Sequence, residues 1–166
     1  MAIEHDFFGL LESGPDGSIF WSENVELGDQ TVTVDLTAPD QDDVSAAALD
    51  VAAGLISAIE AIDRTARNAM VSELDDRTSE VTEYILQQQQ VLGDELEDML
   101  VDISGDTHID IIRSLQFMSM TILADEHGGN DPFAVLEYAL DPDATDEVLL
   151  VNLGSDGDVL SVTSAD

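Results

Sequence analysis

The chain has 166 residues, the length of a single domain, and folding at this size buries about 70% of the unfolded surface, enough for a core without disulfides. It has no cysteine, which excludes disulfides, thiolate nucleophiles and zinc–sulfur sites. With 37 acidic residues against 4 basic ones, its formal net charge is -33. Such a surface repels nucleic-acid phosphates and anionic lipids, so we expect neither a nucleic-acid nor a membrane partner.

The hydrophobic content excludes a disordered chain. Hydrophobic residues make up 44% of the sequence and the mean hydropathy is +0.03, whereas disordered chains lack apolar surface to bury. No apolar run approaches the ~18 residues of a membrane helix, and the first residues carry acidic groups where a secretion signal has basic ones. We therefore expect a globular, cytoplasmic protein with an acidic coat.

Residues 5–36 are predicted to form strands. The aromatic and aliphatic run at 5–12 is followed by dense turn formers at 13–18, which favours a hairpin. A second turn near Gly28 leads into a segment whose apolar residues alternate with polar ones: Val32, Val34 and Leu36. This period of two is typical of a strand with one face in water.

Residues 42–103 are predicted to be helical. Acidic residues precede an alanine-rich segment, where they satisfy free backbone N–H groups and oppose the helix dipole. Apolar residues from Val44 to Met70 then recur at steps of three and four, as in a helix with a wide apolar face. This periodicity is compatible with one helix that continues to Leu74 and with a bend near 62–63.

A further helix is predicted to end at Gly93, because glycine accepts the conformation that terminates a helix. Asp94 and Glu97 resemble a capping box for a last short helix through Ile103. The four glutamines at 87–90 lie within helical periodicity and are predicted to be on the helix surface.

Residues 116–163 are again predicted to form strands, separated by turn-rich stretches. The segment 148–151 is apolar at every position, which is typical of a strand covered on both faces. Strands, then helices, then strands predict an α+β protein in a single domain spanning 1–166. We expect a mixed or mostly antiparallel sheet made by the N- and C-terminal strands, with the central helical segment packed on one face.

The loop at 154–158 has two aspartates around a glycine, as in some metal-binding loops. A calcium loop of the EF-hand type also needs oxygen ligands at fixed alternate positions, and the chain after Asp156 does not supply them. Asp156 and Gly157 between apolar runs instead favour a tight hairpin, because the glycine accepts positive φ.

The polar loop "ADEHGGNDP" is the second candidate metal site. Asp125, His127 and Asp131 offer ligands for a divalent cation, but no second histidine lies at ligand spacing in the same element. His108 would have to be brought near by the fold. We therefore predict no metal or other cofactor, and keep these three residues as the alternative.

The candidate interaction residues are Trp21, Glu137 and Tyr138. Trp21 is either an exposed aromatic anchor for a partner or part of the core, and we favour the core. Glu137 interrupts an apolar strand, and it either faces solvent, which we favour, or pairs with Arg113 inside. There is no phosphate loop, nucleophile elbow or HExxH motif, and the sequence therefore favours a protein that is not an enzyme.

Four stretches carry a resemblance to a known family: "DFFGLLES", "IFWSENVELGDQTVTVDL", "IDRTARNAM" and "EYALDPDATDEVLLVNLGSDGDVLSV". Together they resemble an uncharacterised bacterial family catalogued as domain of unknown function two-thousand-and-four. The resemblance implies that Arg67 and the stretch from Tyr138 to Asp141 recur in the family, and it implies no catalytic role. The closing residues, 163–166, depart from the acid-serine ending of the family pattern.

We expect a protein-binding module for a basic partner, because a strongly negative surface steers and complements a positive one. Small acidic proteins without catalytic motifs are similar, as a class, to immunity proteins that neutralise bacterial toxins. One alternative is a metal-binding protein or metal-dependent enzyme that uses Asp125, His127 and Asp131. Another is a partner-independent acidic surface adapted to high salt, where screening weakens the repulsion between carboxylates.

Overall fold

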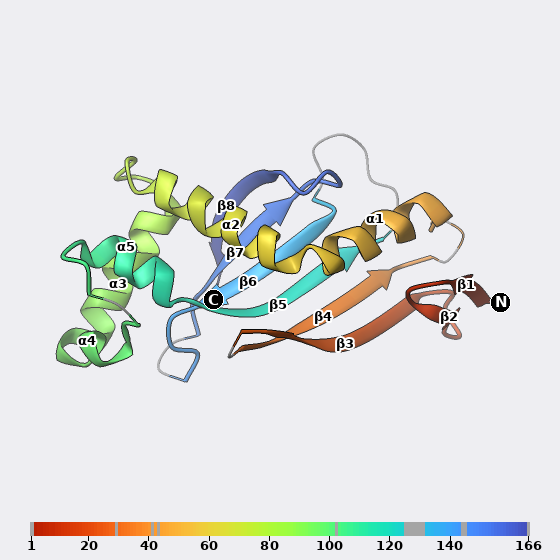
Figure 1. The fold of residues 1–166 in the computed structure, drawn as a ribbon, viewed down its shortest axis with the longest axis horizontal. Helices are drawn as coiled ribbons and strands as arrows, with labels where there is room; N and C mark the ends of the chain where they lie inside the picture. The colour runs from red at the N-terminus through yellow and green to blue at the C-terminus, as the bar shows by residue number, and fades with distance from the viewer. Residues whose placement is uncertain are drawn as a thin grey trace.

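The protein has an α+β fold with a mixed six-stranded sheet and a separate two-stranded sheet (Figure 1). The computed structural model describes residues 2–28, 30–40, 42, 44–101, 103–124, 132–143 and 146–165. The small sheet pairs β1 (Ala2–His5) with β2 (Gly9–Glu12). The large sheet has the order β3 (Ile19–Leu27), β4 (Gln30–Ala38), β5 (Gln116–Leu123), β6 (Ala134–Ala139), β7 (Val148–Leu153) and β8 (Val159–Ala165).

All the helices of the described residues lie in the connection between β4 and β5, which are parallel neighbours in the sheet. Parallel strands need a long crossover, whereas the antiparallel neighbours in the rest of the sheet are joined by shorter connections. The crossover contains α1 (Ala46–Ser57), α2 (Ile59–Glu73), α3 (Glu80–Leu92), α4 (Leu96–Met99) and α5 (Thr107–Ser114), with a 3-10 turn, Gly93–Glu95, before α4. The α+β prediction, with strands at both ends and helices in the centre, is confirmed.

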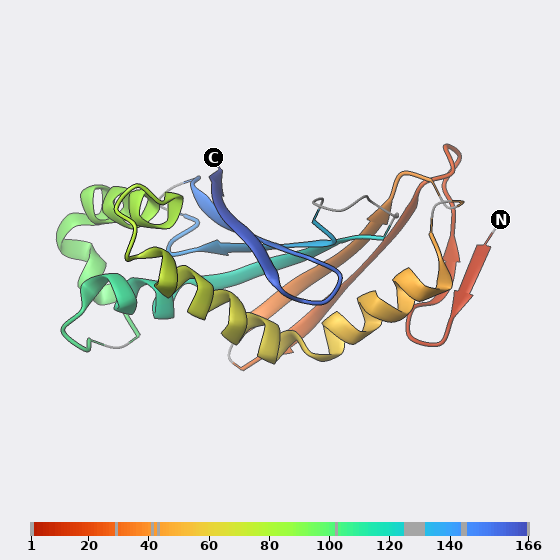
Figure 2. The same ribbon diagram turned by 90° about the horizontal axis from the view of Figure 1, so that it is seen from above.

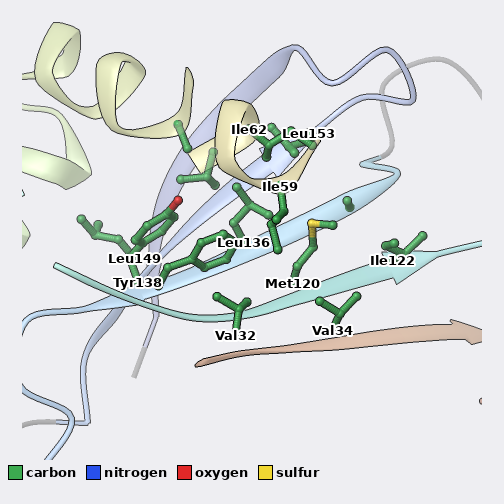
Figure 3. Close-up of a cluster of buried hydrophobic side chains, with 14 of the residues drawn as sticks. Val32, Val34, Ile59, Ile62, Met120, Ile122, Leu136, Tyr138, Leu149 and Leu153 are labelled. Atoms are coloured by element: carbon green, nitrogen blue, oxygen red, sulfur yellow. The ribbon is translucent and has the colours of Figure 1, made fainter. Parts of the chain in front are cut away.

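The core lies between one face of the large sheet and α1 and α2. Figure 2 shows these two helices along that face, while α3, α4 and α5 gather beyond one end of the sheet. In Figure 3 the side chains from the sheet point towards α2, and the buried residues labelled there include Val34, Met120, Leu136, Ile59 and Ile62. Burial of this apolar surface is the main force that holds the helices on the sheet.

The predicted alternation in β4 is confirmed, since Val32, Val34 and Leu36 are fully buried and the intervening side chains are not. The prediction for 148–151 is wrong. Leu149 and Val151 are buried, but Val148 and Leu150 are only half-buried, because helices cover one face of β7 and not the other. A continuous apolar run in the sequence does not show whether one face of the strand or both faces are covered in the folded protein.

The helices differ from the prediction in their boundaries. The chain breaks between α1 and α2 at Ala58, earlier than the bend expected near 62–63. The predicted capping box is also wrong, because α4 begins after a 3-10 turn and Glu95 at its N-cap makes no side-chain capping bond. Helix α5 lies beyond the range predicted for helices, and Asp106 caps it by accepting a hydrogen bond from the Ile109 N–H at 3.3 Å.

The run predicted as one strand at 5–12 is the second half of a hairpin, because the chain turns back on itself between β1 and β2. Gly9 supports this turn with a φ of 71°, a conformation that strains other residues. The hairpin predicted at Gly157 is confirmed. There the Asp156 carboxylate accepts a hydrogen bond from the Asp158 N–H at 3.1 Å, so this acid stabilises the turn.

Gln88 is the exception among the glutamines predicted to lie on the surface. Its side chain is fully buried on the inner side of α3, and neither its amide nitrogen nor its amide oxygen has a hydrogen-bond partner among the described residues. A buried polar group without a partner loses its hydration without compensation. Gln88 therefore destabilises the fold.

We predict that Gln88→Met raises the free energy of unfolding by about 1 to 2 kcal/mol, because methionine has a similar shape and needs no hydrogen bonds. Chemical denaturation measures this value. Gln90→Met is the matched control, since Gln90 is exposed on the same helix, and it should change stability by less than about 0.5 kcal/mol. A loss of stability in Gln88→Met would show that the buried amide has a partner.

Candidate functional site

The face of the large sheet that lies opposite α1 and α2 is the first candidate surface. In parallel and antiparallel pairs alike, residues that lie opposite each other on neighbouring strands point to the same side of the sheet. The pairing therefore defines which residues belong to this face. We name it the open face, and its centre is formed by Thr33, Asp35, Thr121, Glu137, Leu150 and Asn152. These side chains are half-buried by their neighbours, and no helix of the described chain packs over them (Figure 2).

The open face carries carboxylates among both polar and apolar side chains, since Val135 pairs with Thr121 and Asn152, and Leu150 pairs with Glu137. The Ser119 hydroxyl donates to Glu137 Oε2 at 3.1 Å, and the Asn152 amide donates to Ser161 Oγ at 3.0 Å. Glu137 thus lies on the solvent-facing side that we favoured, and its described hydrogen bond is to Ser119. Neither Asp35 nor Glu137 takes part in an ion pair among the described residues. Both carboxylates are therefore available to accept hydrogen bonds from a cationic ligand.

Arg67 organises a partly buried network on the other side of the sheet. Its Nε donates to Asp63 Oδ1 at 3.0 Å, one turn earlier on α2. Its two terminal nitrogens donate to the carbonyls of Ile112 at 2.7 Å and Leu115 at 2.8 Å, at the C-terminus of α5. A helix C-terminus has unpaired carbonyls and partial negative charge, which a guanidinium satisfies well. Arg67 therefore joins α2 to α5.

Tyr138 connects this network to the sheet. Its hydroxyl donates to Asp63 Oδ1 at 2.7 Å, and the Arg67 guanidinium lies 5.2 Å from its ring centroid. The ring also stacks on Phe117 of β5, with centroids 4.9 Å apart. Burial raises the pKa of Tyr138, and the negative charge of Asp63 raises it further. We use the name Arg67 network for Arg67, Asp63 and Tyr138. Its role is structural, because its hydrogen bonds join α2 to α5 and to β6.

An aromatic cluster surrounds Trp21 at the N-terminal end of the molecule. Trp21 is half-buried and packs edge-on against Phe8, with ring centroids 4.8 Å apart, as expected for a residue at the border of the core. His5 ties this hairpin to α1, since its Nδ1 accepts from the Phe7 N–H and its Nε2 donates to Asp50 at 2.8 Å. Phe20, next to Trp21, points to the open face and is 67% exposed.

The loop of Asp125, His127 and Asp131, kept as the alternative metal site, lies outside the described residues. His108 lines a cavity of about 380 Å³ between the C-terminus of α2 and the start of α5, together with Asp75 and Asp106. Within the described ranges, no group of three histidine, cysteine or acidic residues is placed to hold a metal ion.

Asp110, the other acid near His108 in the sequence, has a different role. Its carboxylate accepts hydrogen bonds from the Ser104 hydroxyl at 2.7 Å and the Ser104 N–H at 2.8 Å. These bonds lower the pKa of Asp110, with a smaller contribution from the charge of Arg113. Asp110 therefore stabilises the loop before α5.

Sequence reasoning named Glu137 and Tyr138, which lie on opposite faces of β6, but it missed Asp63 and the role of Arg67. The spacing of Asp63 and Arg67, four residues apart in a helical segment, is the signal that indicates their pairing. The target of the remaining guanidinium donors is 45 residues away in the chain, and no local pattern indicates it.

No family model, curated protein or solved structure matches the chain. The resemblance to the domain of unknown function therefore stays a prediction. No helix among the described residues has the length and apolar character needed to cross a membrane.

We predict that Arg67→Lys lowers the free energy of unfolding by roughly 2 to 4 kcal/mol, because lysine keeps the charge but loses the planar fork that reaches Asp63 and two carbonyls at once. Thermal and chemical denaturation measure the loss. Arg64→Lys is the control, because Arg64 is 70% exposed and its ion pair with Glu60 is long, at 3.8 Å. We expect its free energy of unfolding to change by less than about 0.5 kcal/mol. Equal effects of the two substitutions would contradict the role of the network.

The raised pKa values of the two buried tyrosines, Tyr84 and Tyr138, lead us to predict a loss of stability at alkaline pH. Burial raises the pKa of Tyr84 from 10.0 to about 12, and the pKa of Tyr138 is raised as well. Above pH 10 an unfolded tyrosine releases its proton while the buried one keeps it, so stability is complete below pH 10 and falls as pH rises through the folded pKa. Because the chain has no lysine, these tyrosines dominate titration in that range.

We expect a slope of up to about 1.4 kcal/mol per pH unit for each tyrosine above pH 10. Denaturation at a series of pH values measures the slope, and ultraviolet absorbance of tyrosinate follows the ionisation directly. Tyr84→Phe and Tyr138→Phe should each remove about half of the slope. If both variants keep the full slope, other groups control alkaline unfolding.

Proposed function

We propose that this protein is a non-enzymatic binding module whose acidic surface, centred on the open face, receives a basic protein partner. The observation that supports this most directly is the one-sided covering of the sheet. The helices pack on one face, while the other presents Asp35 and Glu137 with no described cationic partner. A sheet face with available carboxylates matches arginine and lysine side chains, which donate several hydrogen bonds each.

The net charge gives this surface long-range attraction for a basic molecule. At low salt, a charge of -33 increases the association rate with a positive partner and disfavours acidic competitors. Contacts between exposed charges add little affinity individually, so selectivity requires several of them on one surface. One kind of basic protein partner is a toxin that an acidic immunity protein binds and neutralises.

A second candidate function is solubility in concentrated salt, independent of any partner. It is favoured by the distribution of the exposed carboxylates, which occur on separate elements of the fold: Glu23 on β3, Asp50 on α1, Asp98 on α4 and Asp156 in the last hairpin. Arginine forms only two ion pairs among the described residues, with Glu60 and Asp63. Most of the mutual repulsion must then be reduced by solvent ions.

The binding proposal predicts capture of basic proteins from the native cell extract at low salt, with recovery that falls steeply as salt rises towards molar concentration. The double variant Asp35→Asn with Glu137→Gln should reduce recovery several-fold, because it removes both carboxylates from the centre of the open face. The matched control is Glu97→Gln with Asp98→Asn, which removes the same charge from exposed positions on α4. Recovery should be unchanged in the control.

Equal recovery by the wild type and both variants would contradict the open face as the binding surface, and capture of no basic protein would contradict the proposed function. The free energy of unfolding over the same salt range, without a partner, tests the second candidate. A steep rise of stability between low and molar salt supports adaptation to salt, since ions then screen repulsion that is present in the folded protein.

A further inference from the structure

The two edges of the large sheet differ in how they are protected. On the β8 edge, α2 and α3 pack against the strand. The Ser164 N–H donates to Glu80 Oε1 at 3.3 Å, and the Ser164 hydroxyl points to the same oxygen at 3.4 Å. A side chain from α3 therefore occupies a backbone donor that an added strand would need.

The β3 edge has no comparable cover. Backbone pairing beside it is limited to its first residue, through an isolated bridge between Ser13 and Ile19, although the Trp21 side chain also packs against Phe8 of the β1–β2 hairpin. From Phe20 to Leu27 the outer edge has no neighbouring strand among the described residues, and β3 forms the border of the sheet in Figure 1. Alternate residues of such an edge direct N–H and C=O groups to solvent, where they can pair with another strand.

The side chains of β3 restrict which strand can pair there. Phe20 is 67% exposed, and Glu23 and Glu26 are also exposed further along the strand. Two copies joined through antiparallel β3 edges would place glutamates near glutamates and bring together two molecules of charge -33. Like charges opposite each other destabilise a strand pair, whereas opposite charges stabilise it. The edge thus disfavours a second copy and favours a basic segment.

We propose that the β3 edge binds an extended segment of a basic partner as an added antiparallel strand, with lysine or arginine opposite Glu23 and Glu26 and an apolar residue opposite Phe20. This inference rests on the proposed function, which it deepens by naming the form of the partner. The three positions are each three residues apart, so an antiparallel segment reads basic-x-x-basic-x-x-apolar. Backbone hydrogen bonds supply affinity and these side chains supply selectivity.

The test uses a synthetic peptide that contains Lys-Thr-Thr-Lys-Thr-Thr-Val and a second peptide of the same sequence, N-methylated on the alternate residues that face β3. Both have the same charge, but the second cannot donate backbone hydrogen bonds to the edge. At low salt we expect the first peptide to bind and to slow hydrogen exchange of the β3 amides. N-methylation should weaken binding about tenfold or more, the equivalent of one or two lost hydrogen bonds.

Two double variants with equal net charge separate the edge from the general acidity. Glu23→Gln with Glu26→Gln should weaken binding of the unmodified peptide several-fold, while Glu95→Gln with Glu97→Gln, at exposed positions near α4, should leave it unchanged. Equal binding of the two peptides, equal effects of the two variants, or protection confined to other strands would overturn the proposal. Concentration-dependent dimers of the wild type in which the β3 amides are protected from hydrogen exchange would also overturn it and assign the edge to a second copy.

Failure of this inference is distinguishable from failure of the proposed function. If basic proteins are captured through Asp35 and Glu137 but neither peptide responds to changes in β3, the open face binds the partner and the edge does not. If neither basic proteins nor the unmodified peptide bind at low salt, both proposals fail.

Discussion

The hydrogen bonds of the Arg67 guanidinium set how α2, α5 and the large sheet meet. The apolar core holds α1 and α2 on the sheet and includes Ile111 and Ile112 of α5, but apolar contact is not directional and does not by itself set the orientation of α5. Arg67 fixes it, because its donors have a rigid geometry and reach Asp63 on its own helix and carbonyls at the end of α5 together. Tyr138 then ties the same carboxylate to the centre of the sheet.

This network also separates the two faces of β6 into different environments. On the inner face, Tyr138 is enclosed between Phe117 and the arginine, and its pKa is raised by burial. On the outer face, Glu137 is half-buried, and its described hydrogen bond is to the hydroxyl of Ser119. Two adjacent residues thus have opposite roles, one in holding the fold and one on the surface that we propose binds a basic partner.

The acidic coat constrains both the partner and the edges of the sheet. With no lysine in the chain, the usual protection of an edge strand by lysine is absent, and glutamates occupy β3 instead. On β8 the protection comes from α3, through packing and through Glu80. This asymmetry connects the composition of the chain to the proposed place where a basic strand adds to the sheet.

The fold class, the alternation in β4 and the turn at Gly157 can be predicted from the sequence, because each depends on patterns of residues that are close along the chain. It did not determine the break at Ala58, the buried amide of Gln88 or the second face of β7, because each depends on which surface the folded chain brings opposite. The Arg67 network and the open edge of β3 likewise depend on contacts between segments that are far apart in the sequence. The Arg67 guanidinium reaches a carbonyl 45 residues away only after the helices have packed together. A strand lies at the edge of a sheet only once the order of the strands is set.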